Sequence, residues 1–327
     1  MAGGQTFGIP SAGGNLAVNR LSKKLRALGQ PLMRYRQFTS KSAEFGKRQG
    51  STLLFDKRLN LSGDPSTGSI VAEGSPIPRS GYSIVQGSCV AQASGHAIPW
   101  TEELATFAEF DIDKVNREVL VDYMAKALNY RAYDQFNASN VCYIPTGGGT
   151  PAATWDTDGT PSTAADRNVT LFDVKNVVDA LKKGVYGSAV SAPVEAYDGA
   201  NYMAIGSVDY TRALRDDSDW ENAARYGDPE RLFAGEVGRI FGTRTVEDNH
   251  ILGLLGSAGT FKGEAFIFGK DPVIEIIAVP EEVRIDIPSD FGRDRAIAFY
   301  YLGGFSIVWG YNETTEPDNR IVRITSS

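Results

Sequence analysis

The stretch SIVAEGSPIPRSGYSIVQGSCVAQASGHAIPWTEEL, residues 69–104, decides how this chain is built. Its first part is dense in glycine, serine and proline, as turns require. From Gly81 onward, small, polar and apolar residues follow one another without a thick hydrophobic stripe, which predicts an extended strand. At Pro99 the pattern changes, and Glu102 and Glu103 follow in what would be the first turn of a helix, where the helix dipole favours acids. The stretch therefore predicts a strand that runs directly into a helix.

A second extended run, STLLFDKRLNL at 51–61, precedes this stretch. The residues between the two runs, 62–80, have the composition of turns, so the sequence predicts a long two-stranded loop. Such a loop cannot bury a core of its own, and an isolated hairpin is marginal in water. We therefore expect it to need a partner, either its own body or a neighbouring chain.

The clearest helical pattern begins at Asp111, where apolar residues recur at spacings of three and four along about 25 residues. At 1.5 Å per residue this predicts a helix about 35 Å long, with charged residues on the opposite face. We expect the apolar face to pack against the body. Its members are Ile112, Val115, Val119, Tyr123, Ala127 and Tyr130.

The remainder segregates helical from strand-like segments, which favours an α+β fold over a doubly wound sheet. A helix is expected over 170–184, with Thr170 and Asp173 as a capping box and Gly184 at its end. Residues 143–168 are predicted to be a loop by composition. Strands are expected at 273–279, 283–287, 295–311 and 320–326, where β-branched and aromatic residues gather.

The run GEVGRIFGTRTVEDNH, 235–250, has three closely spaced glycines. A nucleotide-binding loop follows a strand and opens a helix. Here the order is reversed: DPERLF at 228–233 has a helical pattern, and TRTVED after Gly242 alternates like a strand. The glycines are therefore predicted to serve turns and strands.

Chemistry-bearing motifs are scarce. The two histidines, His96 and His250, have no metal-ligand or protease spacing around them. The two cysteines, Cys89 and Cys142, form no zinc motif and are expected to be small buried residues. The acidic segment 215–230 does not follow the calcium-loop pattern. We expect neither an enzyme, nor a cofactor, nor a metal site.

The formal net charge of −7 is unevenly spread over the 327 residues. Residues 1–60 carry 11 Lys and Arg against two acids, which gives +9 and leaves −16 for residues 61–327. A basic arm on an acidic body is expected where the arm lies on another subunit's acidic surface or on nucleic acid. No run approaches the roughly 20 apolar residues of a membrane span, so no membrane partner is expected.

The order of these parts resembles that of the major capsid proteins of tailed bacteriophages, which have the HK97-like fold. Residues 69–104 look like the returning strand of that family's extended loop running into its spine helix, with Glu73-Gly74 and Pro76 as the recurrent part. Residues 235–250 look like a strand segment of its axial domain. The ending FYYLGGFSIVWGY…RIVRITS is similar to its peripheral-domain strands. Within the family, the N4-like podovirus subgroup is the most similar.

The resemblance implies four parts: an N-terminal arm at 1–45, an extended two-stranded loop at 46–98, a peripheral domain with the spine helix at 99–165 and 286–327, and an axial domain at 166–285. Two groups of contact residues go with it. Inter-subunit or DNA contacts of the basic arm are Arg20, Lys23, Lys24, Arg26, Arg34 and Arg36. Inter-subunit contacts of the extended loop are Lys57, Arg58, Glu73 and Gly74.

The implied function is self-assembly into pentamers and hexamers of an icosahedral head, put together in the cytoplasm of a bacterial host, that encloses double-stranded DNA. The DNA would be held without sequence specificity, because Lys and Arg neutralise phosphates without reading bases. A portal, a possible cement protein and a separate scaffolding protein are the implied partners. Some members crosslink a loop lysine to a neighbour's asparagine; no matching motif surrounds Lys57, so no crosslink is expected.

Three alternatives remain open. One is another virion component, such as a tail or decoration protein, although such proteins usually lack a spine helix of about 25 residues and a mixed core of this size. An encapsulin-type compartment shell shares the fold but encloses enzymes, and the contents of purified particles would separate the two. An α+β enzyme without a recognisable motif would instead be a compact monomer in solution.

Overall fold

The computed structural model describes most of the chain from residue 31 onward. The described residues are 31, 33–42, 46, 50–61, 71, 73–74, 76–77, 79–109, 111–147, 152–161, 163–216, 236–251, 264–287, 293–312 and 318–325, with the side chains of 236–240 left out. The expected helix at 228–233 lies outside this part of the chain.

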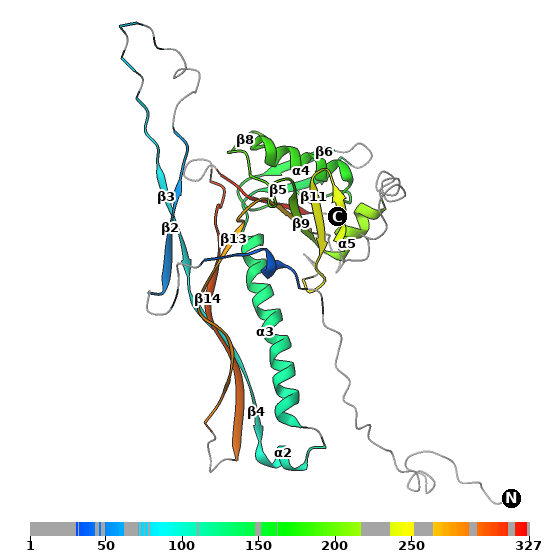
Figure 1. Cartoon of the computed structure of the whole chain (residues 1–327). Helices are drawn as coiled ribbons and strands as arrows, with labels where there is room; N and C mark the ends of the chain where they lie inside the picture. Colours follow the sequence, from blue (N-terminus) through cyan, green and yellow to red (C-terminus); the bar gives the residue numbers. More distant parts are fainter. Residues whose placement is uncertain are drawn as a thin grey trace, which may run out of the picture.

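The molecule has three parts: a compact body, an elongated layer below it, and a hairpin that extends away from both (Figure 1). The elongated layer is a four-stranded sheet in the order β1-β13-β14-β4, with the long helix α3 alongside it. The strands of this sheet are β1 (Ser40–Lys41), β13 (Val273–Ile285), β14 (Asp294–Ile307) and β4 (Gln92–Thr101). The two separate strands expected at 273–279 and 283–287 are one strand, whose register is irregular between Ile277 and Glu282, around Pro280. Proline lacks the N–H that a regular ladder needs, which accounts for the irregularity.

The body is built on a mixed seven-stranded sheet in the order β10-β11-β9-β12-β15-β5-β6. Its strands are β10 (Glu236–Ile240), β11 (Thr243–Glu247), β9 (Tyr202–Gly206), β12 (Glu264–Phe268), β15 (Ile321–Thr325), β5 (Cys142–Thr146) and β6 (Ala152–Asp156). The helices α4 (Leu171–Lys183) and α5 (Val208–Arg215) and the short hairpin of β7 (Val185–Tyr186) and β8 (Ala189–Val190) complete it.

Strand β12 shows why this sheet is the centre of the molecule. All five of its side chains are buried, and the last four alternate between two hydrophobic clusters. Ala265 and Ile267 belong to the cluster that contains α4 and α5. Phe266 and Phe268 belong to the cluster on α3, where their rings lie 6.0 and 5.1 Å from that of Phe136. A strand covered on both faces needs apolar side chains throughout, and this one has them apart from its first residue.

The long helix α3 (Ile112–Asn137) is confirmed, with Asp111 as its N-cap: the Lys114 N–H donates to Asp111 Oδ1 at 3.2 Å. The shorter α2 (Glu102–Phe107) precedes it and is capped by Thr101. Strand β4 therefore does run directly into a helix, as the stretch 69–104 predicts.

The predicted packing face of α3 is wrong for its outer members. Val119 and Tyr130 are 52% and 53% exposed, whereas Leu120, Leu128 and Phe136 are fully buried. Neighbouring positions on a helix point about 100° apart, so the buried stripe lies on a different side from the predicted one. The predicted stripe includes two tyrosines, which have an apolar body and a polar tip and lie readily at a surface.

The other members of the predicted face have intermediate positions. Ile112 and Ala127 are half-buried beside Trp100 and Leu120, and Val115 is half-buried as well. Tyr123 is exposed at one edge but stacks on the sheet, with its ring centroid 4.8 Å from that of His96.

The hairpin consists of β2 (Thr52–Arg58) and β3 (Ile84–Val90), paired antiparallel. Only Ala91 separates β3 from β4, so the polypeptide is extended from the hairpin down the elongated layer (Figure 1). The predicted pairing of two strands is present between β2 and β3, whereas the rest of the second predicted run, from Gln92, pairs with β14 in the elongated layer.

Local sequence rules hold elsewhere in the body. The capping box of Thr170 and Asp173 is present on α4, and Gly184 ends this helix in the left-handed conformation. Between β10 and β11, Phe241 and Gly242 both have positive φ (48° and 78°), which is the hairpin turn that glycine favours.

One predicted loop is wrong in part. Residues 143–168 contain most of β5 and all of β6, which pair antiparallel. Strand β6 is held by tertiary packing that composition does not reveal: the Trp155 ring lies 4.8 Å from Tyr143 and 5.5 Å from Tyr186.

The sheets also cross the predicted domain boundaries. Strand β13, in the predicted axial segment, pairs with β14 of the predicted peripheral segment. Strand β15, at the predicted peripheral C-terminus, pairs with β12 in the middle of the body. The helices in the described part of the chain include none long and apolar enough to cross a membrane.

Candidate assembly surfaces

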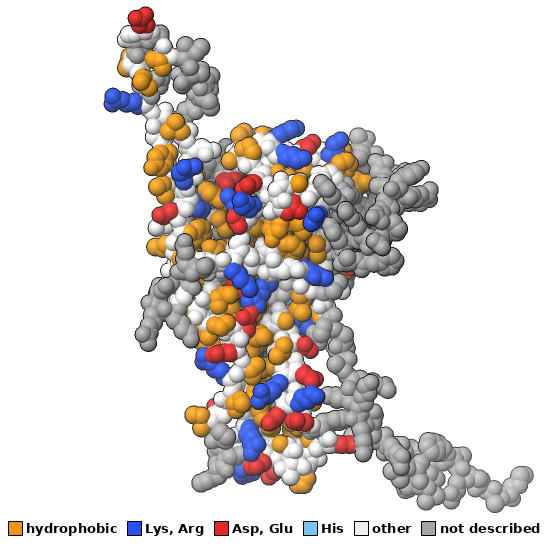
Figure 2. Space-filling model, in the orientation of Figure 1, with side chains coloured by type: hydrophobic (Ala, Val, Ile, Leu, Met, Phe, Trp, Pro, Cys, Tyr) orange, Lys and Arg blue, Asp and Glu red, His pale blue; other side chains and the backbone are white. Residues whose placement is uncertain are grey.

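The hairpin has two unlike faces. Residues at alternate positions point toward the body or away from it because side chains alternate along a strand. The outward row mixes apolar and polar residues, and Leu54, Ile84 and Val90 are all exposed. Figure 2 shows hydrophobic side chains along this hairpin and again over the region of the long helix. One polar pair lies among them: Gln86 Nε2 donates to Asp56 Oδ1 at 3.2 Å.

Toward its far end the hairpin continues to expose large apolar side chains. Leu61, Ile77 and Tyr82 are each more than half exposed. Glu73 and Gly74, two of the predicted contact residues, lie in an exposed turn, and Gly74 has a φ of 80°. Arg58 is exposed on the outward row. Lys57 is different, because its side chain is directed inward and is buried.

The root of the hairpin lies on β14 at close range. A Cβ at Gly304 would overlap the backbone carbonyl of Val90 and lie 3.3 Å from Cys89 Sγ, so only glycine allows this approach. Ser306 Oγ donates to the Ser88 carbonyl at 3.0 Å. Cys89 is fully buried here against Ile276. Burial raises the pKa of its thiol to about 11, and that of Cys142 likewise, so both cysteines are inert packing residues.

The arm segment, which we define as residues 33–42, packs against the body of its own chain. Its short 3₁₀ helix η1 (Tyr35–Phe38) inserts two rings between α3 and β12. The Tyr35 ring lies 5.2 Å from that of Tyr133 and 5.9 Å from that of Phe266. Phe38 packs on Phe268 at 5.5 Å. The segment then adds β1 to the edge of β13 in parallel.

Acidic residues of the body receive the polar groups of this segment. Glu275 is fully buried; Arg36 Nη2 and Nε donate to its Oε1 at 2.7 and 3.1 Å, and Thr39 Oγ1 donates to its Oε2 at 3.1 Å. The Tyr301 hydroxyl donates to the same carboxylate at 3.1 Å. Arg36 also forms an ion pair with Glu281.

The two predicted arm contacts in the described residues therefore have intrachain positions. Arg36 is held by Glu275 and Glu281, and the backbone N–H of Arg34 donates to Asp248 Oδ2 at 2.7 Å. The other four, Arg20, Lys23, Lys24 and Arg26, lie outside the described residues. The charge asymmetry indicates that the basic arm contacts acidic residues. It does not distinguish acidic residues of the same chain from those of a neighbouring subunit.

Exposed apolar side chains also lie on α2 and at the end of β13. Phe107 of α2 and Ile287 beyond β13 are both 86% exposed, and Leu104 and Ile285 are exposed as well. Ion pairs join α2 to the neighbouring strand: Arg295 Nη2 lies 3.1 Å from Glu102 Oε1. Sequence periodicity did not reveal this group, because its members lie on two segments far apart in the chain.

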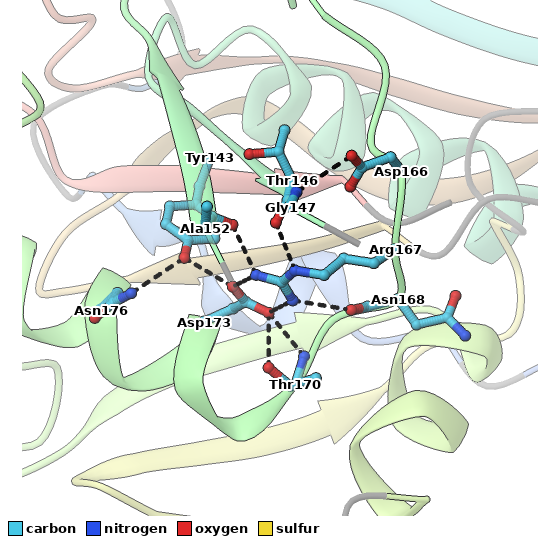
Figure 3. A network of polar contacts seen from close by, with 10 residues as sticks. All are labelled: Tyr143, Thr146, Gly147, Ala152, Asp166, Arg167, Asn168, Thr170, Asp173 and Asn176. Atoms are coloured by element: carbon cyan, nitrogen blue, oxygen red, sulfur yellow. Dashed lines mark hydrogen bonds and ion pairs between the residues drawn. The ribbon is translucent and has the colours of Figure 1, made fainter. Parts of the chain in front are cut away.

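The most site-like polar network lies in the body, and Figure 3 shows it. Arg167 and the buried Asp173 form a bidentate pair at 2.6 and 2.7 Å. The Tyr143 hydroxyl donates to Asp173 Oδ1 at 2.8 Å, and the Thr170 N–H donates to Oδ2 at 2.8 Å. The second oxygen also receives Thr170 Oγ1 at 3.0 Å, so both carboxylate oxygens have several donors.

Arg167 makes further bonds to backbone carbonyls, at 2.8 Å to Thr146 and 2.8 Å to Ala152. Because these residues belong to β5 and β6, the network joins this pair of strands to the start of α4. Burial raises the pKa of the Tyr143 hydroxyl well above its usual value, so it stays a donor. A network with all its partners in place fixes structure and leaves no group ready for chemistry.

The two histidines have packing roles. His96 lies on Tyr123, and His250 Nδ1 lies 3.1 Å from Asn129 Nδ2. Burial lowers the pKa of His250, which favours its neutral form. Within the described residues, no three His, Cys, Asp or Glu side chains come together as a metal site would require.

Similarity to solved structures identifies the fold of this chain. No family model matches the sequence, and no curated protein does. Solved structures of phage capsids match it over nearly its whole length at low identity.

Three of these structures are the following. A chain in the capsid structure of Helicobacter pylori bacteriophage KHP30 aligns with a TM-score of 0.73 at 12% identity, over 100% of both chains. A chain in the capsid of Ralstonia phage GP4 aligns at 0.68 and 14% identity, over 99% of this chain and 98% of that one. A chain of the cyanophage Pam1 capsid aligns at 0.63 and 16% identity, over 95% of this chain and 96% of that one. The chain thus has the HK97-like fold, as the order of its parts predicts.

Proposed function

We propose that this chain is the major capsid protein of a tailed bacteriophage, a shell subunit that assembles with its own copies into the pentamers and hexamers of an icosahedral head. The fold supports this proposal over the full length of the chain, including the hairpin and the long helix. The observation that carries it is the hairpin's outward row. Leu54, Ile84 and Val90 are exposed on a two-stranded element that the described part of the chain covers on one face alone.

The outer face of α3 is a suitable receptor for that row on a neighbouring copy. Val119, Tyr123 and Tyr130 form an exposed stripe at helical spacing. Burying two such rows against each other removes apolar surface from water, at about 25 cal/mol per Å². Because hairpin and helix face are different surfaces, the contact is heterologous, and repeated heterologous contacts close into rings and shells.

The finer assignments belong to the same proposal. The hairpin region, 46–98, acts as the extended loop, and residues 166–285, which contribute β9 to β12 to the seven-stranded sheet, act as the axial part. The pairing of β13 with β14 supports counting that strand with the peripheral part. The partners are a scaffolding protein, a portal and a cement protein, and DNA is held without sequence specificity through the basic residues at 20–26. The assignment to the N4-like subgroup rests on the sequence resemblance, which extends over nearly the whole chain.

The test is size-exclusion chromatography with negative-stain electron microscopy on the expressed chain, alone and with the scaffolding protein of its phage. Capsomers or closed shells are expected in at least one of the two preparations. A species of 35.4 kDa in both would overturn the proposal. The contents of the particles decide the remaining alternative, since an enzyme cargo in place of nucleic acid would indicate a compartment shell.

A further inference from the structure

Lys57 departs from the pattern of the hairpin that carries it. Its sequence neighbours Asp56 and Arg58 are exposed, as on any outward-facing charged row, whereas Lys57 is only 5% exposed. It shares the inward row with Leu53 and Phe55, which pack on β13. A buried lysine loses the hydration of its ammonium group, so an apolar residue would be the simpler occupant.

The body provides compensating groups for this charge. Lys57 Nζ lies 5.1 Å from the centroid of the Trp309 ring and 5.8 Å from that of the Phe55 ring. Trp309 is itself buried, and the Arg320 guanidinium lies 5.8 Å from the same ring. Asp318 is also near: burial raises the pKa of its carboxyl, and the charges of Arg320 and Lys57 oppose that rise.

This contact is distinct from the attachment at the hairpin root. Gly304 and Ser306 hold Val90 and Ser88, which lie at the end of β3 next to β4. Lys57 pairs with Val85, toward the other end of the same two strands. The root contacts and the apolar packing of Leu53 and Phe55 hold the part of the hairpin nearer β4. Lys57 adds an attachment farther along the hairpin, and contacts at separated points set its angle.

We propose that Lys57, held over Trp309, is a positioning residue that sets the angle of the hairpin against the body. The ammonium group matters as well as the stem, because the indole face attracts a cation. The angle is a property of the single chain. Its use, to present the outward row to a neighbouring copy, rests on the proposed function.

The direct test is a distance distribution between two spin labels, one on the hairpin and one on the body of the full chain. Leu54→Cys and Lys182→Cys provide exposed sites, and the native cysteines are buried thiols that label slowly. Dilution with unlabelled chain restricts the signal to pairs within one molecule, so the result does not depend on whether the protein assembles.

In this background, Lys57→Met keeps the stem and removes the cation. We expect it to broaden the distance distribution about twofold, because the hairpin can then pivot on its root. Arg58→Met is the matched control, since it removes the same charge from the next, exposed position, and it should leave the distribution unchanged. Lys57→Arg should restore the parent's width. A Lys57→Met distribution as narrow as the parent's would overturn the proposal.

Hydrogen exchange gives a second readout. A detached two-stranded hairpin is marginal, so the amides of β2 should exchange about tenfold faster in Lys57→Met than in Arg58→Met. If circular dichroism shows that Lys57→Met does not fold, Trp309→Phe replaces it, since a smaller ring holds the cation less well. Parent-like width and exchange in that variant would contradict the proposal equally.

Discussion

The arm segment and the hairpin both extend from the same body, but their apolar side chains differ in burial. Both combine basic and apolar side chains. The arm segment adds β1 to the edge of the elongated sheet, whereas the hairpin forms a separate two-stranded sheet. In the arm segment, Tyr35 and Phe38 are buried and Arg36 ends on the buried Glu275. In the hairpin, Leu54 and Ile84 are exposed.

The difference shows which segment is held by contacts within one molecule and which leaves its apolar side chains exposed. The contacts of the arm segment lie within one molecule, so losing them should cost folding free energy. Leu54 and Ile84 of the hairpin's outward row are exposed, so changing them should cost little folding free energy and affect association. The predictions below test this division, beginning with the largest effect on stability.

The aromatic anchor of the arm segment should matter most. Tyr35→Ala removes a buried ring that touches Tyr133 and Phe266, and should lower the free energy of unfolding by about 4 kcal/mol. Urea unfolding followed by circular dichroism measures this. Gln37→Ala, at an exposed position of the same turn, is the control and should change stability by less than about 0.5 kcal/mol. A cost for Tyr35→Ala as small as that of the control would show that the Tyr35 ring does not anchor the arm segment.

The ion pair of the arm segment comes next. Arg36→Leu leaves Glu275 as a buried carboxylate without its cation, and should cost about 3 kcal/mol. Arg34→Leu removes the same charge from the same segment but retains the backbone N–H that reaches Asp248, so its cost should be much smaller. Urea unfolding of the two variants measures both costs. A larger loss of stability in Arg34→Leu than in Arg36→Leu would refute the intrachain role of Arg36.

The hairpin root should show an intermediate effect. Gly304→Ala places a methyl group against the Val90 carbonyl and should cost about 2 kcal/mol through forced displacement of the two strands. Gly310→Ala, whose Cβ would lie 3.7 Å from Ile307, is the control. Thermal unfolding of both variants measures the difference, and a Gly304→Ala midpoint equal to the control's would mean that the root is not tightly packed.

A pH effect should be smaller still. Burial raises the pKa of Glu281, but its backbone hydrogen bond and Arg36 outweigh this and lower it below the ordinary value of 4.5. The stability that Glu281 adds is therefore present above that value and is lost as the pH falls through the folded-state pKa. Glu281→Gln should be less stable than the parent by about 0.5 kcal/mol at pH 7, since the pair is partly exposed. Urea unfolding at a series of pH values should show the gap closing in acid; a gap that widens in acid would show the opposite sign.

Much of the fold could be predicted because it rests on local rules. The hairpin, the capping box on α4 and the turn at Gly242 all depend on residues near one another in sequence. The face of α3 could not be predicted as well, since Leu120 and Val119 have similar hydropathy and only the position of the sheet decides between them.

The assembly surfaces divide in the same way. The composition of 46–98 indicates an element in need of a partner, and its exposed outward row agrees. The ion-pair partner of Arg36 is Glu275, which lies 239 residues away in sequence. The inward position of Lys57 likewise depends on a distant residue, Trp309. Such pairings follow from the tertiary fold and leave no trace in local spacing.

The division between a complete arm segment and an incomplete hairpin is tested most directly by sedimentation velocity on one variant, Leu54→Asp with Ile84→Asp, beside the parent under conditions in which the parent assembles. Both changed side chains are exposed on the outward row, so the fold should keep its stability within about 0.5 kcal/mol. We predict a folded species of 35.4 kDa where the parent forms capsomers or shells. A variant that assembles as the parent does would contradict the account, because the hairpin's outward row would then not be the surface that joins the copies.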